Sequence, residues 1–109
     1  MNTRKKGSIA ENKAIEFLIK NGFKIVKTNF YCKFAEIDII ALKNNTLHFI
    51  EVKSGKNFEP IYNITPKKVS KIVRCAYFYI QKYNLLYNFE IDAIIIKDKK
   101  LEFIKNITL

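Results

Sequence analysis

Two short segments of the sequence carry charged residues inside otherwise apolar runs. The first reads AEIDIIA and contains Glu36 and Asp38, and the second reads FIEVK and contains Glu51 and Lys53. Side chains alternate between the two faces of a strand, so each pair shares one face. A hairpin that brings these faces together would gather at least two carboxylates and one ammonium at the same place.

Such a cluster suits a divalent cation. Charges in apolar strands are costly unless they are paired or bind a metal, and close carboxylates repel one another, which raises the pKa of one of them. Mg²⁺ accepts a few carboxylates and keeps several waters, which leaves positions for phosphate oxygens. Lys53 could stabilise the charge that develops on a phosphate or orient a water for attack. The competing interpretation is a structural salt bridge between Asp38 and Lys53.

Glu11 is a third candidate acid, because it lies on the inner side of a predicted helix. At about 100° per residue, Glu11 falls within the apolar arc and close to Leu18, whereas Glu16 falls on the opposite side. An inward glutamate in the first turn of a helix could cap that helix, with Ser8 as its partner in a capping box. Alternatively, Glu11 reaches the carboxylates of the two strands.

The helices and strands that must position these residues are predicted from the periodicity of apolar residues and from the turn and capping residues between them. Ser8–Asn21 is predicted to be a helix that ends at Asn21-Gly22. Three strands are predicted next, of which the second and third form a hairpin around the turn at residues 43–45: Phe23–Asn29, Phe34–Leu42 and Thr46–Lys53.

The second half of the chain is predicted to hold a loop at Ser54–Asn63, a second helix and further strands. Thr65-Pro66 announces the helix, with Thr65 as the N-cap, and its apolar face continues to about Leu86. A fourth strand is predicted at Phe89–Ile96 and an edge strand at Leu101–Lys105. The order α-β-β-β-α-β, followed by a short strand, predicts an α/β fold with a mixed central sheet flanked by helices.

The composition indicates a folded and strongly basic protein. The 109 residues, 49% of them hydrophobic, suffice for one domain spanning residues 1–109. Lys and Arg number 20 against 10 Asp and Glu, and the formal charge of +10 favours a polyanionic partner such as nucleic acid. A general enrichment in lysine would explain the same charge without such a partner.

The chain also shows no predicted membrane span and no secretory signal, so we expect a soluble, cytoplasmic protein without a membrane partner. Cys32 and Cys75 have no metal-type spacing and are predicted to be free thiols in a reducing compartment.

The two charged segments together resemble the signature of the PD-(D/E)XK nucleases. More narrowly, the chain resembles the YraN family of predicted endonucleases, which are themselves similar to archaeal Holliday-junction resolvases. The resemblance runs over nearly the whole chain and includes four further segments: Ala10-Glu11, Asn21-Gly22-Phe23, Thr65-Pro66-Lys67-Lys68 and Phe89-Glu90-Ile91-Asp92.

The resemblance implies a restriction-endonuclease-like fold and a Mg²⁺- or Mn²⁺-dependent endonuclease acting on DNA rather than RNA, with branched or structured DNA as one class of substrate. The side chains of Asp38 and Glu51 and the carbonyl of Val52 would bind the metal. Lys53 would be the catalytic lysine, Glu11 an auxiliary acid, and Glu36 a further candidate. Related resolvases dimerise to cut two strands, so the resemblance also allows a homodimer.

Three positions depart from the family pattern. Ala35 replaces a glycine, Gly55 replaces an arginine two residues after the motif lysine, and the fourth strand lacks its arginine. The missing arginines favour a second hypothesis, a nuclease-fold module that binds nucleic acid with little or no catalysis. A third is a small basic protein whose strand charges form salt bridges.

Basic residues along the second helix are candidates for phosphate contacts. Lys68 lies at the margin of the apolar face and is the best of them, and the same helix carries Lys67, Lys71 and Arg74. His48, whose strand parity differs from that of Glu51, is predicted to be a packed or edge residue. Asp92 is predicted to be structural and to pair with a lysine.

Overall fold

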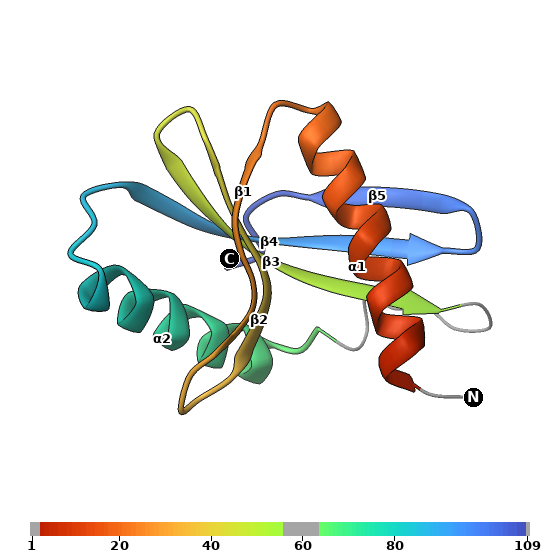
Figure 1. Cartoon of the computed structure of the whole chain (residues 1–109). Coiled ribbons are helices and arrows are strands. Elements are labelled where there is room, and N and C mark those ends of the chain that lie inside the picture. Colours follow the sequence, from red (N-terminus) through yellow and green to blue (C-terminus); the bar gives the residue numbers. More distant parts are fainter. Residues whose placement is uncertain (1–2, 56–63, 109) are drawn as a thin grey trace.

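A five-stranded mixed sheet with a helix on each face forms the protein (Figure 1). The computed structural model describes residues 3–55 and 64–108, and side chains from Ile9 onwards. The predicted element order is confirmed, with these bounds: α1 Thr3–Lys20, β1 Lys24–Tyr31, β2 Glu36–Lys43, β3 Thr46–Gly55, α2 Pro66–Lys82, β4 Asn88–Lys97 and β5 Lys100–Ile104. The predicted loop at Ser54–Asn63 lies mostly outside the described residues, although Ser54 and Gly55 extend β3.

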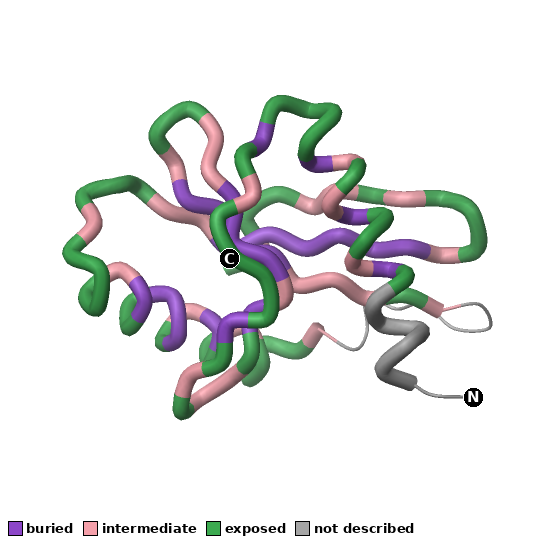
Figure 2. The backbone as a smooth tube through the Cα atoms, viewed as in Figure 1, coloured by how far each residue is buried: buried purple, intermediate pink, exposed green. Residues whose placement is uncertain are grey.

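The strands follow one another across the sheet in the order β1-β2-β3-β4-β5. All neighbouring pairs are antiparallel except β3 and β4, which run parallel and are joined by a connection that includes α2. The central strands are the most deeply buried part of the chain (Figure 2). The sheet is therefore mixed, as the order of the elements predicted.

Alternation along β3 sends neighbouring side chains to opposite faces of the sheet. Ile50 packs with Ala14 and Leu18 of α1, whereas Phe49 packs with Ile72 and Ala76 of α2. Two apolar cores result, one under each helix, and every residue of β3 can be assigned to one face of the sheet by its parity. Neither helix in the described part of the chain is long and apolar enough to cross a membrane.

The helix boundaries differ from the predicted ones. α1 begins at Thr3, so Ser8 lies inside the helix and the predicted capping box with Glu11 is wrong. The residues just before Ser8 are mostly basic and show no helical periodicity of apolar residues, yet they form the first part of the helix. α2 ends at Lys82 rather than near Leu86, because Asn84 adopts a left-handed conformation with φ of 53° that turns the chain away.

The start of α2 follows the sequence prediction. The Thr65 hydroxyl accepts a hydrogen bond from the Lys68 amide at 3.2 Å, and Pro66 occupies the first turn. These two residues fix the helix start before its apolar face begins.

The two cysteines form a disulfide, so the prediction of free thiols is wrong. Cys32 lies in the connection between β1 and β2, and Cys75 is fully buried in α2. In the folded chain this connection lies against α2, and the two sulfur atoms meet. The two cysteines are 43 residues apart in the sequence, so this contact could not be predicted from their spacing.

Candidate active site

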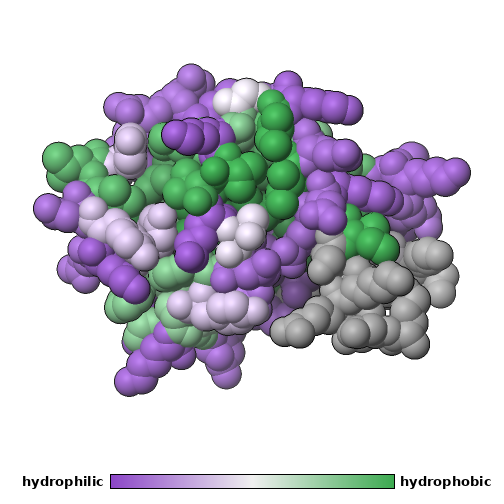
Figure 3. Space-filling view, viewed as in Figure 1, coloured by the Kyte–Doolittle hydropathy of each residue, from purple (hydrophilic) through white to green (hydrophobic). Residues whose placement is uncertain are grey.

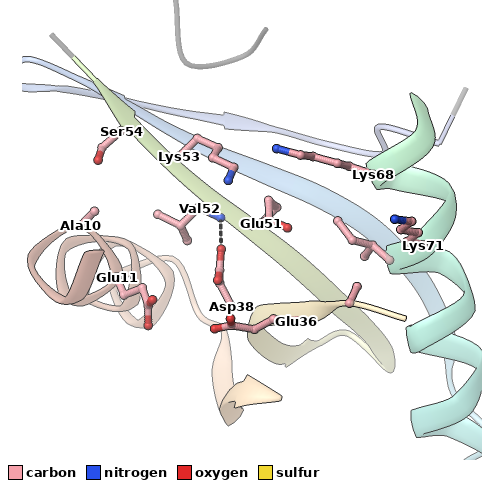
Figure 4. A pocket seen from close by; sticks show the side chains of 12 residues that line it. Ala10, Glu11, Glu36, Asp38, Glu51, Val52, Lys53, Ser54, Lys68 and Lys71 are labelled. Atoms are coloured by element: carbon pink, nitrogen blue, oxygen red, sulfur yellow. Dashed lines mark hydrogen bonds between the residues drawn. The ribbon is translucent and has the colours of Figure 1, made fainter. Parts of the chain in front are cut away.

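The candidate site lies where β2 separates from β3. The pairing of β2 with β3 reaches Ile39 and Ile50, whereas β3 stays paired with β4 as far as Gly55. Asp38 and Glu51 are the next residues beyond the last pair. Instead of a backbone partner, the Val52 amide donates to Asp38 Oδ2 at 2.8 Å (Figure 4). The predicted hairpin thus brings the two acidic segments together.

A pocket of about 390 Å³ opens beside this point. Acids from three elements line one side of it, and lysines of α2 face them from the other side (Figure 4). Twelve residues form its walls: Ala10, Glu11, Ala35, Glu36, Asp38, Glu51, Val52, Lys53, Ser54, Lys68, Lys71 and Ile72. All the strand residues predicted for the site are among them, and so is Glu11.

Among the acids of the pocket, Glu51 has the carboxyl group with the most strongly shifted pKa. Burial raises its pKa, a side-chain hydrogen bond with Asp38 and the charge of Asp38 raise it further, and the Lys53 ammonium lowers it, with a net value of about 9. Burial and the neighbouring Asp38 carboxylate therefore outweigh the Lys53 ammonium in setting this pKa. Close carboxylates in a partly buried pocket fit the donor set of a divalent metal.

Glu11 and Glu36 extend the cluster. Burial and the charge of Asp38 raise the pKa of both carboxyl groups. With its amide nitrogen facing the two acids, Asn29 donates to Glu36 Oε1 at 3.1 Å and to Glu11 Oε1 at 3.2 Å. Asn29 therefore holds α1 and β2 acids side by side at the rim of the pocket.

Asn29 is a site residue that the sequence did not reveal. It lies near the end of β1 with a φ of 52°, in the left-handed region that asparagine tolerates better than most residues. An asparagine in an otherwise strand-like segment hints at a special position. Its two partners, Glu11 and Glu36, could not be predicted, because they belong to two other elements.

Val52 offers backbone groups to the same pocket. In an extended strand the N–H and C=O of one residue point to the same side. Since the Val52 amide points toward Asp38, its carbonyl also faces the side from which β2 has separated. Asp38, Glu51 and Val52 therefore border the same pocket, with Glu11 close by, and their oxygens are available as metal ligands.

The lysines divide into those at the pocket and those away from it. Lys53 lines the pocket without an Asp38–Lys53 ion pair among the described residues, so the simple cross-strand salt bridge is absent. Lys68 and Lys71 also line it, whereas Lys67 does not. Arg74 instead places its guanidinium over the Phe34 ring, 4.0 Å from the centroid.

His48 agrees with its sequence prediction and Asp92 departs from it. His48 is packed and buried on the central strand β3, and its Nδ1 lies 2.6 Å from Asp92 Oδ2. Asp92 pairs with this histidine and not with a lysine, and its other oxygen accepts from the Asn106 amide at 2.8 Å. The spacing of Glu90 and Asp92 signalled two acids on one face of β4, but the neighbouring histidine depends on strand pairing.

The fold and site now define the class of protein: an α/β protein with a restriction-endonuclease-like fold. The structure of Hjc, a Holliday junction resolvase from Archaeoglobus fulgidus, is similar, with a TM-score of 0.57, 20% sequence identity, and 87% of this chain and 72% of that chain covered.

Within that class the chain belongs to the uncharacterised protein family UPF0102, the YraN family, whose model matches residues 10–96. A UPF0102 protein of Helicobacter hepaticus is 51% identical over 109 residues and covers 100% of this chain and 99% of its own length. A UPF0102 protein of Aliarcobacter butzleri is 54% identical over 109 residues, covering 98% and 99%. The predicted family and fold are therefore confirmed.

Proposed function

We propose that this protein is a metal-dependent endonuclease that hydrolyses phosphodiester bonds in DNA, with branched or structured DNA as its preferred substrate. The observation that supports the proposal most is the pocket in which Asp38, Glu51 and Lys53 face Lys68 and Lys71. On one side of the pocket lie carboxylates, which are suitable ligands for a divalent metal ion. On the other side lie lysines, which can contact phosphate groups.

Each group has a distinct role in this proposal. A bound Mg²⁺ or Mn²⁺ would supply Lewis-acid stabilisation of the phosphate and a more acidic water. Asp38, Glu51 and the Val52 carbonyl would hold the ion, and Glu11 would support it as an auxiliary acid. Lys53 shares the face of Glu51 and would stabilise negative charge on the reacting phosphate.

The lysines of α2 would bind the DNA backbone next to the scissile bond. Lys68 and Lys71 lie one turn apart and both border the pocket, so one strand of phosphates can follow that helix. Contacts of this kind position DNA without reading its bases. The shape of the substrate, rather than its sequence, would then determine where cleavage occurs.

The proposal of structured DNA as the substrate is also supported by the similarity to a solved structure. The similar solved structure is that of a Holliday junction resolvase. The pocket is formed by one chain, and a four-way junction has two symmetrical cleavage points, so two copies of this chain would be needed to cut it.

A cleavage panel tests the proposal directly. Four-way junction, flap, duplex and single-stranded DNA, with an RNA duplex alongside, are incubated with Mn²⁺ or Mg²⁺ and the tag-free protein. We expect metal-dependent nicking of the branched substrates, at least 100-fold reduced in Lys53→Ala. Metal-independent nicking, or equal nicking by Lys53→Ala, would exclude this site as the active centre. Junction binding without cleavage would identify a binding module that lacks catalysis.

A further inference from the structure

A second cluster of ligand atoms lies on the opposite face of the sheet from the proposed nuclease site. His48 pairs with Glu90 across the parallel β3–β4 ladder, and Ile50 pairs with Asp92 one step further. The three polar side chains have the parity of Ile50 and Ile94, which pack under α1. Glu51 and Lys53 have the other parity, so the two clusters do not share a face.

The cluster is compact and deeply buried. His48 Nδ1 lies 2.6 Å from Asp92 Oδ2 and 3.4 Å from Glu90 Oε2. The side chains of His48 and Asp92 are 7% and 0% exposed, and that of Glu90 is 19% exposed. One nitrogen and two carboxylate oxygens thus meet within 4.8 Å of one another.

The hydrogen bonds of the cluster leave one oxygen without a partner. Asp92 Oδ1 accepts from the Asn106 amide at 2.8 Å, which leaves Oδ2 for the histidine. Glu90 Oε2 is buried and has no hydrogen-bond partner. A buried carboxylate oxygen without a donor costs free energy. A protonated His48 balances one of the two acids, and the Lys105 ammonium, 3.9 Å from Glu90 Oε1 but 66% exposed, balances the other only weakly.

We propose that His48, Glu90 and Asp92 form a second metal site, selective for Zn²⁺ or a similar transition-metal ion over Mg²⁺. An imidazole nitrogen with two carboxylates is a donor set that zinc accepts, whereas Mg²⁺ prefers oxygen alone. The ion would replace the proton shared by His48 and Asp92, give Glu90 Oε2 a partner and balance both acids.

The distances between the ligand atoms fit such an ion after a small adjustment. Donor atoms around a tetrahedral zinc lie about 3.3 Å apart when the bonds are near about 2.0 Å. The His48–Glu90 separation already matches at 3.4 Å, and the His48–Asp92 separation of 2.6 Å must open by less than one ångström. The Asn106 amide orients Asp92 from outside, as neighbours of metal ligands commonly do.

A fourth ligand can reach the ion from an adjoining pocket of about 290 Å³, which both His48 and Glu90 line. Lys43 and Lys105 line the same pocket, and Lys105 Nζ lies 3.9 Å from Glu90 Oε1. A water or a small anion would therefore suit the open position. The ion would also tie β3 and β4 to the C-terminal segment, through Asp92 and Asn106.

Cobalt spectroscopy tests the proposal. Tag-free protein is stripped with a chelator, kept without reductant so that the disulfide persists, and titrated with Co²⁺ and then Zn²⁺. We expect one equivalent of Co²⁺ to give intense visible bands of a four-coordinate site, which Zn²⁺ abolishes and excess Mg²⁺ does not. Bands that Mg²⁺ abolishes, or no bands and no Zn²⁺ binding, would overturn the proposal.

Matched variants assign the ion to its ligands. His48→Gln and Glu90→Gln should each weaken Zn²⁺ binding at least tenfold, whereas Glu102→Gln on β5, an exposed acid, should not. Glu51→Gln should leave Zn²⁺ binding intact, which separates this site from the proposed nuclease site. Since Glu90 is partly exposed, Glu90→Gln gives a folded test even if His48→Gln destabilises the core. Unchanged binding in Glu90→Gln, or binding lost in Glu51→Gln, would refute the site.

Discussion

The carboxyl group of Glu51 couples the site to pH. Its pKa of about 9 in the folded, metal-free protein compares with an ordinary value of 4.5. Between these two values the folded state binds more protons than the unfolded state, so the free energy of unfolding falls as pH rises through that window. The raised pKa values of Glu11 and Glu36 act in the same direction.

Denaturant unfolding of chelator-treated protein between about pH 5 and about pH 9 measures this effect. We expect stability to decrease toward high pH, and Glu51→Gln to flatten the dependence because the amide does not titrate. Mn²⁺ binding to the wild type should release a proton and tighten as pH rises. If the stability of the wild type depended on pH as little as that of Glu51→Gln, Glu51 would have an ordinary pKa.

Asp38→Asn separates metal binding from structural support. The asparagine oxygen can still accept from the Val52 amide, so metal-free stability should be unchanged or slightly higher, within about 1 kcal/mol. Loss of a charged metal ligand should reduce cleavage at least 100-fold and remove the rise in melting temperature that Mn²⁺ gives the wild type.

Glu16→Gln is the matched control for Asp38→Asn, since it removes one exposed acid from α1. It should leave cleavage and the Mn²⁺-induced shift unchanged. A loss of about 3–5 kcal/mol in Asp38→Asn without metal, combined with no Mn²⁺ shift in the wild type, would instead show that Asp38 compensates a partly buried charge.

Among the elements, α2 is attached by a covalent bond to the connection between β1 and β2. The Cys32–Cys75 disulfide closes a loop with a sequence separation of 43 residues, and loop-closure entropy gives an upper stabilisation of about 4 kcal/mol. Dithiothreitol should therefore lower the melting temperature of the wild type. It should not lower that of Cys32→Ser, whose melting temperature should already match the reduced wild type.

The same bond bears on the proposed active site, because α2 carries Lys68 and Lys71. Junction affinity is measured with and without reductant for both proteins. Reduction should weaken binding in the wild type only. An identical response of Cys32→Ser to reductant would mean that the effect arises elsewhere.

Local patterns were sufficient to predict most elements. The apolar period, the Thr65-Pro66 start and the Asn-rich turn at residues 43–45 predicted α2 and the β2–β3 hairpin, because those signals act within a few residues. The start of α1 was wrong because the polar residues before Ser8 show no period. The disulfide was missed because contact between Cys32 and Cys75 depends on packing over 43 residues.

For the site, strand parity and the hairpin predicted that Glu36, Asp38, Glu51 and Lys53 converge. Asn29 and the His48 cluster were beyond that reasoning. Both depend on which strands are neighbours, and a parallel pairing such as that of His48 with Glu90 leaves no local mark in the sequence.

On the scale of the whole molecule, the charge of +10 predicts electrostatic binding to nucleic acid. Hydrophilic side chains surround an apolar area on the face shown in Figure 3. Affinity for junction DNA should fall steeply as salt rises, because cations bound to the phosphates are released. Lys68→Ala should weaken binding to all sequences alike and reduce the salt slope by about one unit.

Lys24→Ala is the control for Lys68→Ala, because Lys24 is exposed at the start of β1, paired with Leu42 and far along the sheet from Glu36. Fluorescence anisotropy at several salt concentrations gives both slopes. Equal slopes for the two variants would indicate that charge acts diffusely rather than at the pocket. An affinity independent of salt would favour a protein partner.

The parallel contact between β3 and β4 also governs how the chain folds. Thr46 pairs with Asn88, 42 residues away (88 − 46), whereas Lys97 pairs with Lys100 across a tight turn. Two local units, the β1–β3 meander and the β4–β5 hairpin, can therefore form early, and joining them must close a long loop. This seam carries Glu51 and Lys53 on one face and the His48 cluster on the other. The proposed His48, Glu90 and Asp92 site takes its ligands from both strands and is thus assembled in the slow step, whereas Asp38, Glu51 and the Val52 carbonyl all come from the β1–β3 meander. An ion at the His48 cluster could therefore not bind productively to a chain that has formed its hairpins but has not yet joined them.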